Sequence, residues 1–532
     1  MAAACAASAR AQRGSRIAPT WESLAGVYRV PDWFRDAKFG IWAHWGPQCQ
    51  PELGDWYARL MYIQGRMSWQ QGQTPYEHHV EHYGHPSRTG FIDIIGKWKA
   101  KNWRPEDLLN RYVKAGARYF MAMGCHHDNF DLFASKHHAW NSARVGPKRD
   151  IVGGWEPLVR EAGLKFGVSN HSGHAWHWYQ VAYGYDAEGP MRARRYDAYW
   201  LRKAHGRGKF WDGLDPQELY TGPYYVPPDG ITSVEAMNSW HDKRDGQWIE
   251  AAPPFNRRFV RSWLARQNQM VDDYRPDLVY FDDTGLPLGQ AGLEAAAHYY
   301  NMVLAQRGNI DVVIFGKKLQ GIERRAIVED VERGSSDEIR DLPWQTDTCI
   351  GNWHYDRRIY ENNGYKTSRE VIQRLADVVS KNGNLLLNIP VRGDGTIDDK
   401  EEAILDEVTA WTQRYGEAIF GSRPWHIFGE GPTNPPSGTL NEGEAKPFTA
   451  LDIRFTRKAD ALYAIFMEWP RGEAAIRALG ERELQGATIE RVELIGGPSL
   501  EYRRDGDALK VTLPAAAGSF TPAIRIRGRG LS

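Results

Sequence analysis

Two adjacent carboxylates, Asp282 and Asp283, end a short apolar run at residues 277–283 (DLVYFDD). The length of the run and its valine and aromatic residues are typical of a buried strand. Successive side chains of a strand point to opposite faces, so one carboxylate can face a cavity while the other caps a helix or pairs. At the carboxyl end of a barrel strand, a carboxylate can act as a nucleophile or a base. Position alone does not separate that role from a structural helix cap.

A second acidic segment, residues 329–334 (EDVERG), follows another strand candidate. Strand alternation places Asp330 and Glu332 on one face and Glu329 on the other. Retaining glycosidases use two carboxyl groups about 5–5.5 Å apart, one as nucleophile and one as acid/base. Asp282 and Glu332 would supply these residue types. Without further information, however, the simplest interpretation of this acidic run is a solvated loop.

Histidines follow two other strand candidates: His44 after the first, and His126 with His127 after the second. Three imidazoles around one cavity could bind zinc or hydrogen-bond to sugar hydroxyls. Adjacent residues of an extended segment point to opposite faces, so we do not expect His126 and His127 to chelate one ion. We favour hydroxyl binding over a metal site, and a hydrogen-bonded core imidazole remains an alternative for one of them.

The charge balance argues against polyanionic partners. Lys and Arg together number 67, as do Asp and Glu, so the formal net charge is zero. Such a chain has no overall field to attract nucleic acid or an anionic membrane surface. No apolar run is long enough to span a membrane. The 22 Trp and 25 Tyr are consistent with a carbohydrate site, and equally with aromatic residues buried in a large α/β enzyme.

The first residues, MAAACAASARAQRG, contain an Ala-x-Ala pattern at positions 9–11. This pattern resembles the end of a secretory signal, although the apolar stretch before it is short and lacks a basic start. We therefore treat residues 1–20 as a leader and expect a periplasmic or secreted protein, with a cytoplasmic one as the alternative. The four cysteines form no Cys-x-x-Cys pair and are expected to be free thiols: Cys5, Cys49, Cys125 and Cys349.

Short apolar runs alternate with segments of helical periodicity, the pattern of a parallel sheet. Seven strands are expected at residues 38–44, 118–123, 165–170, 277–283, 311–316, 326–330 and 384–389, with an eighth near 348–353. Helices are expected at residues 103–115, 369–379 and 401–411. These elements favour an α/β fold, a (β/α)₈-like barrel over residues 21–425. A doubly wound open sheet is the alternative.

Two segments depart from this alternation. Residues 174–255 are polar and rich in Gly, Tyr and Trp, so we interpret them as a long insertion on the active-site face of the barrel. After about residue 425, a Pro/Gly-rich stretch precedes runs of alternating polarity at residues 451–455, 461–466, 490–494, 509–513 and 523–526. These runs predict a C-terminal β-sandwich over residues 426–532.

Taken in order, many segments of residues 20–430 resemble the family 29 α-L-fucosidases. The resemblance rests on these motifs: WFRDAKFGIWAHWG (33–46), GARYFMAMGCHHDNFDLF (116–133), SKHHAWNS (135–142), GPKRDIV (146–152), PDLVYFDD (276–283), ERGSSDEIRDLPWQTDTCIGNWHY (332–355), DVVSKNGNLLLNI (377–389), GDGTI (393–397) and YGEAIFGSRPW (415–425). Each motif alone is weak, and their common order makes the resemblance specific.

The resemblance implies a barrel followed by a β-sandwich, and a retaining hydrolase that removes α-L-fucose through a covalent fucosyl-enzyme. It implies that Asp282 is the nucleophile. It assigns the contacts with the sugar to His44, Trp56, Tyr62, His126, His127 and Tyr280. It implies no metal and no organic cofactor. The expected partner is a fucosylated oligosaccharide or glycoconjugate, and a homo-oligomer stays possible.

The acid/base varies among branches of the family. Glu332 matches the glutamate of the ERG form that precedes PWQTDT. Asp330 and Glu329 are the alternative candidates for the acid/base. Gln345 stands where many members carry Glu, so that position cannot supply the acid here.

One departure from the family pattern follows the third strand. Members commonly read FG-x-YYS, whereas this chain has Ser169 and Asn170 in place of the two tyrosines and continues with His171. His171 is therefore a further candidate for sugar contact. This change leaves linkage preference open, and an α-L-galactoside becomes an alternative substrate. A catalytically inactive carbohydrate-binding protein and a zinc hydrolase that uses the histidines are the remaining alternatives.

Overall fold

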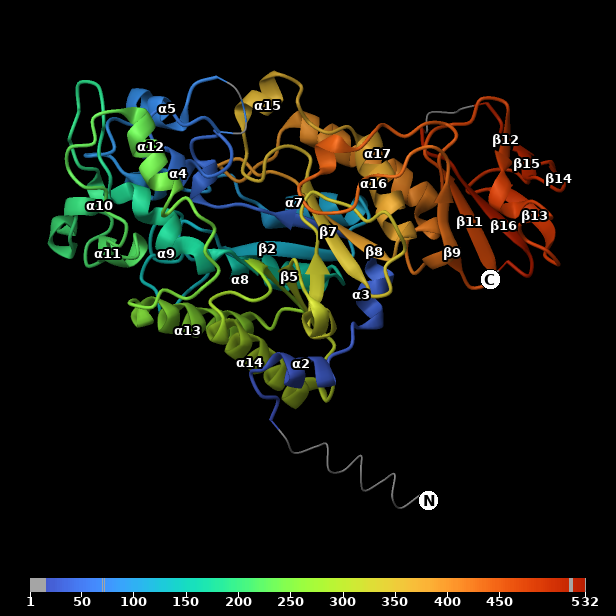
Figure 1. Ribbon diagram of the computed structural model, residues 1–532, viewed down its shortest axis with the longest axis horizontal. Coiled ribbons are helices and arrows are strands. Elements are labelled where there is room, and N and C mark those ends of the chain that lie inside the picture. Colours follow the sequence, from blue (N-terminus) through green and yellow to red (C-terminus); the bar gives the residue numbers. More distant parts are fainter. Residues whose placement is uncertain (1–15, 69, 71, 516–519, 532) are drawn as a thin grey trace, which may run out of the picture.

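The computed structural model describes residues 16–68, 70, 72–515 and 520–531. Eight parallel strands close into a barrel in sequence order, with β1 beside β8 (Figure 1). They are β1 Phe39–Ala43, β2 Tyr119–Cys125, β3 Lys165–Asn170, β4 Leu278–Thr284, β5 Val313–Lys317, β6 Val328–Asp330, β7 Trp344–Cys349 and β8 Gly383–Asn388. The prediction of a closed barrel is confirmed, and the open sheet is excluded.

The eighth predicted strand lies earlier than expected, at Trp344–Cys349 (β7) instead of residues 348–353. Its sequence, WQTDTC, is largely polar, so it lacks the apolar pattern that marked the other strands. All six residues are nevertheless buried. Their polar side chains find partners inside the barrel, as when Gln345 Nε2 donates to Asp330 Oδ1 at 2.9 Å.

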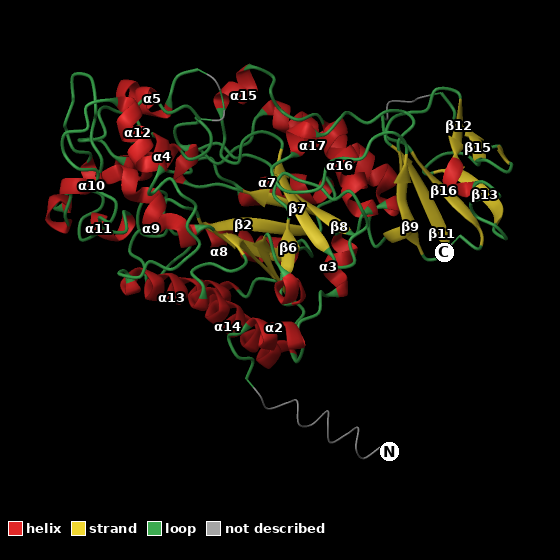
Figure 2. Cartoon of the chain, in the orientation of Figure 1, coloured by secondary structure: helices red, strands yellow, loops and turns green. Residues whose placement is uncertain are grey.

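Helices surround the barrel (Figure 2). They are α2 Trp21–Val27, α3 Asp32–Ala37, α4 Tyr57–Leu60, α5 Pro75–His82, α6 Phe91–Lys97, α7 Pro105–Lys114, α8 Ile151–Glu161, α9 Ala175–Trp178, α10 Asp197–Trp200, α11 Pro216–Leu219, α12 Val234–Asp242, α13 Arg257–Tyr274, α14 Gln290–Arg307, α15 Arg357–Glu361, α16 Ser368–Ser380 and α17 Asp399–Tyr415. The helix predicted at 369–379 begins one residue earlier because Thr367 and Glu370 form a capping box.

The long segment between β3 and α13 contains only short helices, α9 to α12. In Figure 1 these helices gather at one side of the barrel, beside α4 and α5. Tyr62, on the loop after α4, and Tyr220 both hydrogen-bond to the buried carboxylate of Asp197, at 2.8 and 2.6 Å. The predicted insertion is thus attached to the barrel by buried polar contacts as well as by aromatic packing.

The C-terminal part is built from two antiparallel sheets, of strand order β13-β16-β11-β10-β9 and β12-β15-β14. Their strands are β9 Arg423–Glu430, β10 Ile453–Lys458, β11 Ala461–Phe466, β12 Glu473–Ile476, β13 Thr488–Leu494, β14 Tyr502–Arg504, β15 Leu509–Thr512 and β16 Ala523–Arg529. β9, β12 and β14 were not predicted, and β9 crosses the boundary expected between residues 425 and 426.

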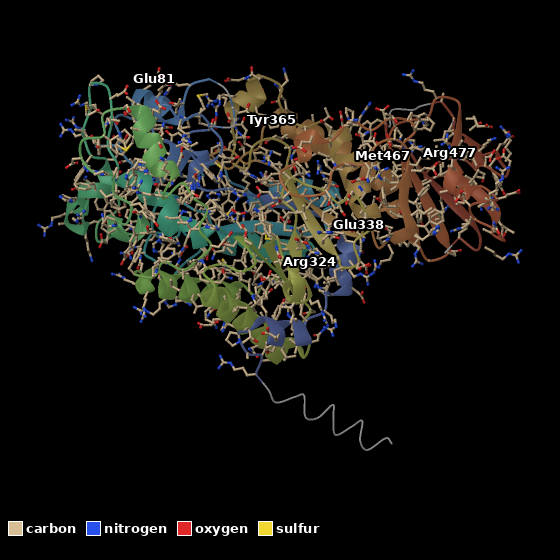
Figure 3. All side chains as sticks on the ribbon, viewed as in Figure 1. Glu81, Arg324, Glu338, Tyr365, Met467 and Arg477 are labelled. Carbon is tan, nitrogen blue, oxygen red and sulfur yellow. The ribbon has the colours of Figure 1, made fainter. Side chains whose placement is uncertain are left out.

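The C-terminal sheets pack against α16 of the barrel. Arg454 of β10 pairs with Asp377 of α16 at 2.6 Å, and both side chains are buried. Gln373 donates to the backbone carbonyl of Met467 at 2.6 Å, in the region where Figure 3 labels Met467. A buried, hydrogen-bonded ion pair fixes the relative orientation of the two surfaces because its geometry is demanding.

Part of the expected leader, residues 1–15, lies outside the described residues, and so does Cys5. Ile17 is buried and exchanges backbone hydrogen bonds with the Asn301 side chain of α14. Packing of the chain on the barrel therefore begins before residue 21. Cys49, Cys125 and Cys349 are free and buried, as expected.

Candidate active site

A cavity of about 1210 Å³ opens at the carboxyl ends of the barrel strands. It is lined by eight of the nine predicted site residues: His44, Trp56, His126, His127, His171, Tyr280, Asp282 and Glu332. They come from loops and strand ends between residues 44 and 332, and only closure of the barrel brings them together. Their individual roles remain predictions.

Asp282 lies near the end of β4, where three nitrogen-bearing groups approach it. The ammonium of Lys317 contacts Oδ1, and His171 Nδ1 and His127 Nε2 lie 3.2 and 3.3 Å from Oδ2. Burial raises the pKa of Asp282, but Lys317 and the two histidines outweigh it and hold that pKa well below its usual value. The side chain is therefore an ionised carboxylate, as a nucleophile requires.

Lys317, the last residue of β5, was missed by sequence reasoning. Its Nζ contacts Asp282 and also lies 2.5 Å from Glu332 Oε2. The two carboxylates raise the pKa of Lys317 well above its usual value despite its burial. Its position at the end of a barrel strand was the available signal, since catalytic side chains gather there.

Of the three acid/base candidates, only Glu332 lines the cavity. Asp330 lies deeper, where its Oδ1 accepts from Gln345, and burial raises its pKa well above the usual value. Glu329 points elsewhere and pairs with Arg340 at 3.0 Å. The predicted alternation along this segment is therefore observed, but Glu332 and Asp330 differ in depth.

Asp283 and Asp282 contact different partners. Asp283 Oδ1 lies 3.0 Å from His174 Nε2, and both side chains are almost fully buried. A Cβ at Gly173 would lie only 2.9 Å from the same oxygen, so glycine is needed for this approach. Both residues line the cavity, but as expected for adjacent strand residues their carboxylates have different partners.

His126 and His127 both line the cavity, with ring centroids 4.4 Å apart. The expectation that they point to opposite faces is wrong, because β2 ends at Cys125 and the two histidines lie in the following turn. Gln48 Nε2 donates to His126 Nδ1 at 2.8 Å. When His126 is neutral, its Nε2 therefore carries the proton and can donate to a ligand.

His44 is a buried imidazole of the cavity wall that packs against other rings but makes no polar contact with the residues that the structure describes. Neither ring nitrogen has a hydrogen-bond partner among the described residues. Burial, with the neighbouring histidines, lowers its pKa well below the usual value. A neutral ring with an unused donor and acceptor, aimed into a cavity, suits a ligand hydroxyl.

Tyr62 is the predicted site residue that the cavity does not include. Its hydroxyl donates to Asp197 at 2.8 Å, lies 3.0 Å from the hydroxyl of Tyr220 and accepts from the amide of Phe91. All of its hydrogen-bonding capacity is used inside the protein. Because the insertion supplies two of these partners, the sequence motif around Tyr62 could not reveal them.

Aromatic rings form the rim of the cavity. Trp56 has a left-handed backbone (φ 63°), a strained conformation for a bulky residue that is common at functional sites. Its ring is parallel to that of Trp248 from the insertion, with centroids 6.3 Å apart. Trp248 was missed by sequence reasoning and is 44% exposed. Trp353 also lines the cavity, with the guanidinium of Arg333 over its ring.

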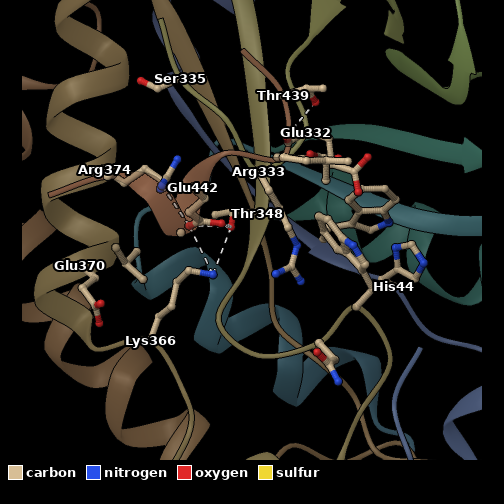
Figure 4. A pocket seen from close by; sticks show the side chains of 18 of the residues that line it. His44, Glu332, Arg333, Ser335, Thr348, Lys366, Glu370, Arg374, Thr439 and Glu442 are labelled. Atoms are coloured by element: carbon tan, nitrogen blue, oxygen red, sulfur yellow. Dashed lines mark hydrogen bonds and ion pairs between the residues drawn. The ribbon is translucent and has the colours of Figure 1, made fainter. Parts of the chain in front are cut away.

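The cavity continues from the catalytic pocket to the surface of α16 (Figure 4). There Glu442 pairs with Arg374 at 3.0 Å and with Lys366 at 3.3 Å. Glu442 belongs to the segment between β9 and β10, so the C-terminal part supplies one wall. Another contact from this segment reaches the site: Thr439 Oγ1 donates to the backbone carbonyl of Glu332 at 2.9 Å.

Three groups of potential metal ligands occur among the described residues. They are His44 with His126 and His171, His127 with His171 and Asp282, and His174 with Glu250 and Asp283. The alternative of a zinc hydrolase used His44, His126 and His127 as ligands. None of the three groups contains this combination. In the first two groups, the same nitrogens face the cavity that would receive a sugar.

A closed (β/α)₈ barrel with two carboxylates near one ammonium, surrounded by imidazoles and indole rings, defines a glycoside hydrolase. Residues 4–417 match the sequence model of the alpha-L-fucosidase family, and residues 446–525 match its C-terminal domain. The chain therefore belongs to the alpha-L-fucosidase family.

Individual relatives support this assignment over nearly the whole chain. The tissue alpha-L-fucosidase of Homo sapiens is 26% identical over 523 residues, which cover 97% of this chain and 91% of that protein. The plasma alpha-L-fucosidase of Homo sapiens is 24% identical, covering 95% and 90%. The structure of Thermotoga maritima alpha-fucosidase with a mechanism-based inhibitor has a TM-score of 0.68 and 25% identity, covering 96% and 100%.

No helix among the residues described by the structure is long and apolar enough to cross a membrane.

Proposed function

We propose that this fucosidase works with retention of configuration, with Asp282 as nucleophile and Glu332 as acid/base. The observation that carries the proposal is that both carboxylates contact the single ammonium of Lys317. Two charge-assisted hydrogen bonds of about 2.8 Å each limit the separation of the two contacting oxygens to about 6 Å. Retaining enzymes place their carboxyl groups about 5–5.5 Å apart, whereas inverting enzymes need roughly 6.5–9.5 Å.

In the first step, a carboxylate oxygen of Asp282 bonds to the anomeric carbon of fucose. The bond from that carbon to the leaving oxygen breaks, and Glu332 transfers its proton to that oxygen. In the second step, a water oxygen attacks the same carbon, the ester bond to Asp282 breaks, and Glu332 takes the water proton. Glu332 must therefore carry the proton before the first step, and it regains one from water in the second.

We propose that the imidazoles of His44, His126, His127 and His171 hold the fucose hydroxyl groups. His44 supports this role because neither of its nitrogens has a hydrogen-bond partner in the described part of the chain. The C5 methyl group requires an apolar surface, for which Trp56 and Tyr280 are candidates on the cavity wall.

We propose a fucosylated oligosaccharide or glycoconjugate as the substrate. The cavity volume, about 1210 Å³, exceeds the usual range of roughly 300–1000 Å³ for small-molecule pockets. A single fucose unit would therefore leave the part of the cavity near Lys366 and Glu442 free for the remaining sugars.

We also propose that the protein is exported, to the periplasm or the medium. Support comes from the Ala-x-Ala pattern of residues 9–11 and from the name of the plasma relative. N-terminal sequencing of the mature protein from its native host tests this. A new N-terminus after residue 11 is expected, and an intact one in a cytoplasmic fraction would contradict export.

The catalytic proposal is tested with an aryl α-L-fucoside and with a 2-deoxy-2-fluoro-α-L-fucosyl donor. Proton NMR during early turnover should show α-L-fucose as the first product, because two displacements retain configuration. After reaction with the fluoro donor, peptide mass analysis should locate one added sugar on Asp282. A β-configured first product or an adduct elsewhere would contradict the proposal.

A further inference from the structure

Beside the catalytic pocket, whose lining includes Asp283, three potential metal ligands converge from separate parts of the chain. Asp283 lies on β4, His174 follows β3, and Glu250 belongs to the insertion. His174 Nε2 lies 3.0 Å from Asp283 Oδ1 and 3.6 Å from Glu250 Oε2, and one atom from each residue lies within 4.8 Å of the others. The His174 and Asp283 side chains are 1% exposed.

A chain of hydrogen bonds fixes the orientation of His174. The backbone carbonyl of Asp245 can only accept, so His177 Nδ1 donates to it at 3.3 Å. In a neutral His177, Nε2 is therefore an acceptor. His174 Nδ1, 3.2 Å away, must then carry a proton and donate to that nitrogen. The lone pair of a neutral His174 is therefore on Nε2, facing the two carboxylates.

The carboxylate of Glu250 is also oriented in advance. The backbone amide of Thr284 donates to its Oε1 at 2.9 Å, which turns Oε2 toward His174. Oε2 of Glu250, Nε2 of His174 and Oδ2 of Asp283 have no hydrogen-bond partner among the described residues, although all three are buried. A lone pair facing two carboxylates is repulsive unless a cation or a proton lies between them.

The separations match those around a small divalent ion. Zinc binds imidazole nitrogen and carboxylate oxygen at about 2.0–2.2 Å in tetrahedral geometry, so its ligands lie roughly 3.3 Å apart. The contacts of 3.0 and 3.6 Å bracket this value. His174 Nδ1 makes a hydrogen bond of its own, to His177, as the second nitrogen of a metal-binding histidine normally does, although its usual partner is a carboxylate, a carbonyl or water.

We propose that His174, Glu250 and Asp283 bind one zinc ion, with a water molecule as the fourth ligand. The ion joins the insertion to β3 and β4 and does not take part in the reaction, because Asp282 is held by a different set of contacts. The ring of Trp248 lies 3.8 Å from that of His174 and also lines the cavity. By fixing Glu250, the ion fixes the neighbouring Trp248 at the rim of the catalytic pocket.

The test measures zinc binding directly. The purified protein is stripped with a chelator and titrated with Zn²⁺ in a calorimeter, and bound metal is counted after dialysis. Wild-type protein should bind one equivalent. Glu250→Gln preserves the shape of a partly exposed side chain and removes one ligand, so it should weaken binding at least about tenfold, the range lost even when outer contacts are removed. Glu235→Gln, an exposed position on α12 of the insertion, should bind zinc as the wild type does.

Two further measurements separate this site from the others. His126→Gln disrupts the competing cluster of His44, His126 and His171 and should leave the zinc affinity unchanged. Zinc should raise the Tm of the wild type, because an ion that binds only the folded chain stabilises it, and should have little effect on Glu250→Gln. The proposal is overturned if the wild type binds no zinc, if Glu250→Gln binds it equally well, or if only His126→Gln loses it. Because no readout depends on turnover, failure of the catalytic proposal would be seen separately.

Discussion

Nζ of Lys317 lies 2.5 Å from Oε2 of Glu332 while the same ammonium contacts Asp282. One cation therefore contacts both proposed catalytic carboxylates. This contact helps to keep Asp282 ionised in a buried pocket. We therefore propose that Lys317 is a positioning residue.

We predict that Lys317→Met moves the acidic limb of the pH profile of kcat/KM to higher pH. Lys317 lowers the pKa of Asp282, so its removal raises that pKa, and Asp282 becomes protonated and inactive at a higher pH. Activity should consequently fall more at pH 5 than at pH 7. Lys318→Met, an exposed neighbour, should leave the limb in place. An unshifted limb in Lys317→Met would show that Lys317 does not control Asp282.

Replacement of Asp282 by Ala should lower kcat by several orders of magnitude, because the covalent step loses its nucleophile. Azide added with an activated aryl fucoside should restore turnover and give the β-configured fucosyl azide through a single displacement. Asp272→Ala, which removes an exposed carboxylate of α13, serves as the control for a lost carboxylate. Near-normal turnover by Asp282→Ala would remove this residue from the mechanism.

For Glu332→Ala, azide should also restore part of the activity, but with the opposite stereochemical result. Azide then attacks the fucosyl-enzyme, so two displacements give the α-configured product. The basic limb of the pH profile should disappear, because the proton donor is lost. Asp330→Asn should not respond to azide. Rescue of Asp330→Asn instead of Glu332→Ala would transfer the acid/base role to Asp330.

Trp248→Ala should reduce kcat/KM for a fucosylated oligosaccharide about two- to tenfold relative to α-L-fucosyl fluoride, which has no second ring. Ring stacking is worth about 0.5–1.5 kcal/mol, and 1.36 kcal/mol corresponds to about tenfold. Trp240→Ala, another indole of the insertion that does not line the cavity, is the matched control. Equal losses on both substrates would argue against a role of Trp248 in holding the remaining sugars.

An aryl α-L-fucoside should be hydrolysed with a kcat/KM at least about fivefold above that of the matching α-L-galactoside. The galactoside replaces the C5 methyl by a hydroxymethyl group, and burying an unpaired hydroxyl against an apolar wall costs about 1–3 kcal/mol. Equal or faster hydrolysis of the galactoside would favour the alternative substrate. Glycan binding without hydrolysis of either would favour an inactive carbohydrate-binding protein.

The local sequence was sufficient to predict a feature when all the residues that determine it lie in one segment. The barrel strand Leu278–Thr284 was expected within one residue at each end, because a strand buried on both faces is a continuous apolar run. Alternation along this strand also predicted that Asp282 and Asp283 have different partners. The same alternation rule did not apply to His126 and His127, because they lie beyond the end of β2 and side chains alternate between faces only within a strand.

Tertiary structure decided which distant side chains meet. Lys317 reaches Asp282 and Glu332 only because β4, β5 and β6 are neighbours in the closed barrel. Tyr62 does not line the cavity, and its hydroxyl instead hydrogen-bonds to Asp197 and Tyr220 of the insertion. The segment after β9 supports the backbone of Glu332 through Thr439, although the two residues are separated by more than a hundred positions. The sequence by itself determined the family, the barrel and the identity of the candidate carboxylates, because these depend on local pattern. Their charge states and partners depend on burial and on contacts between distant segments, which only the folded chain creates.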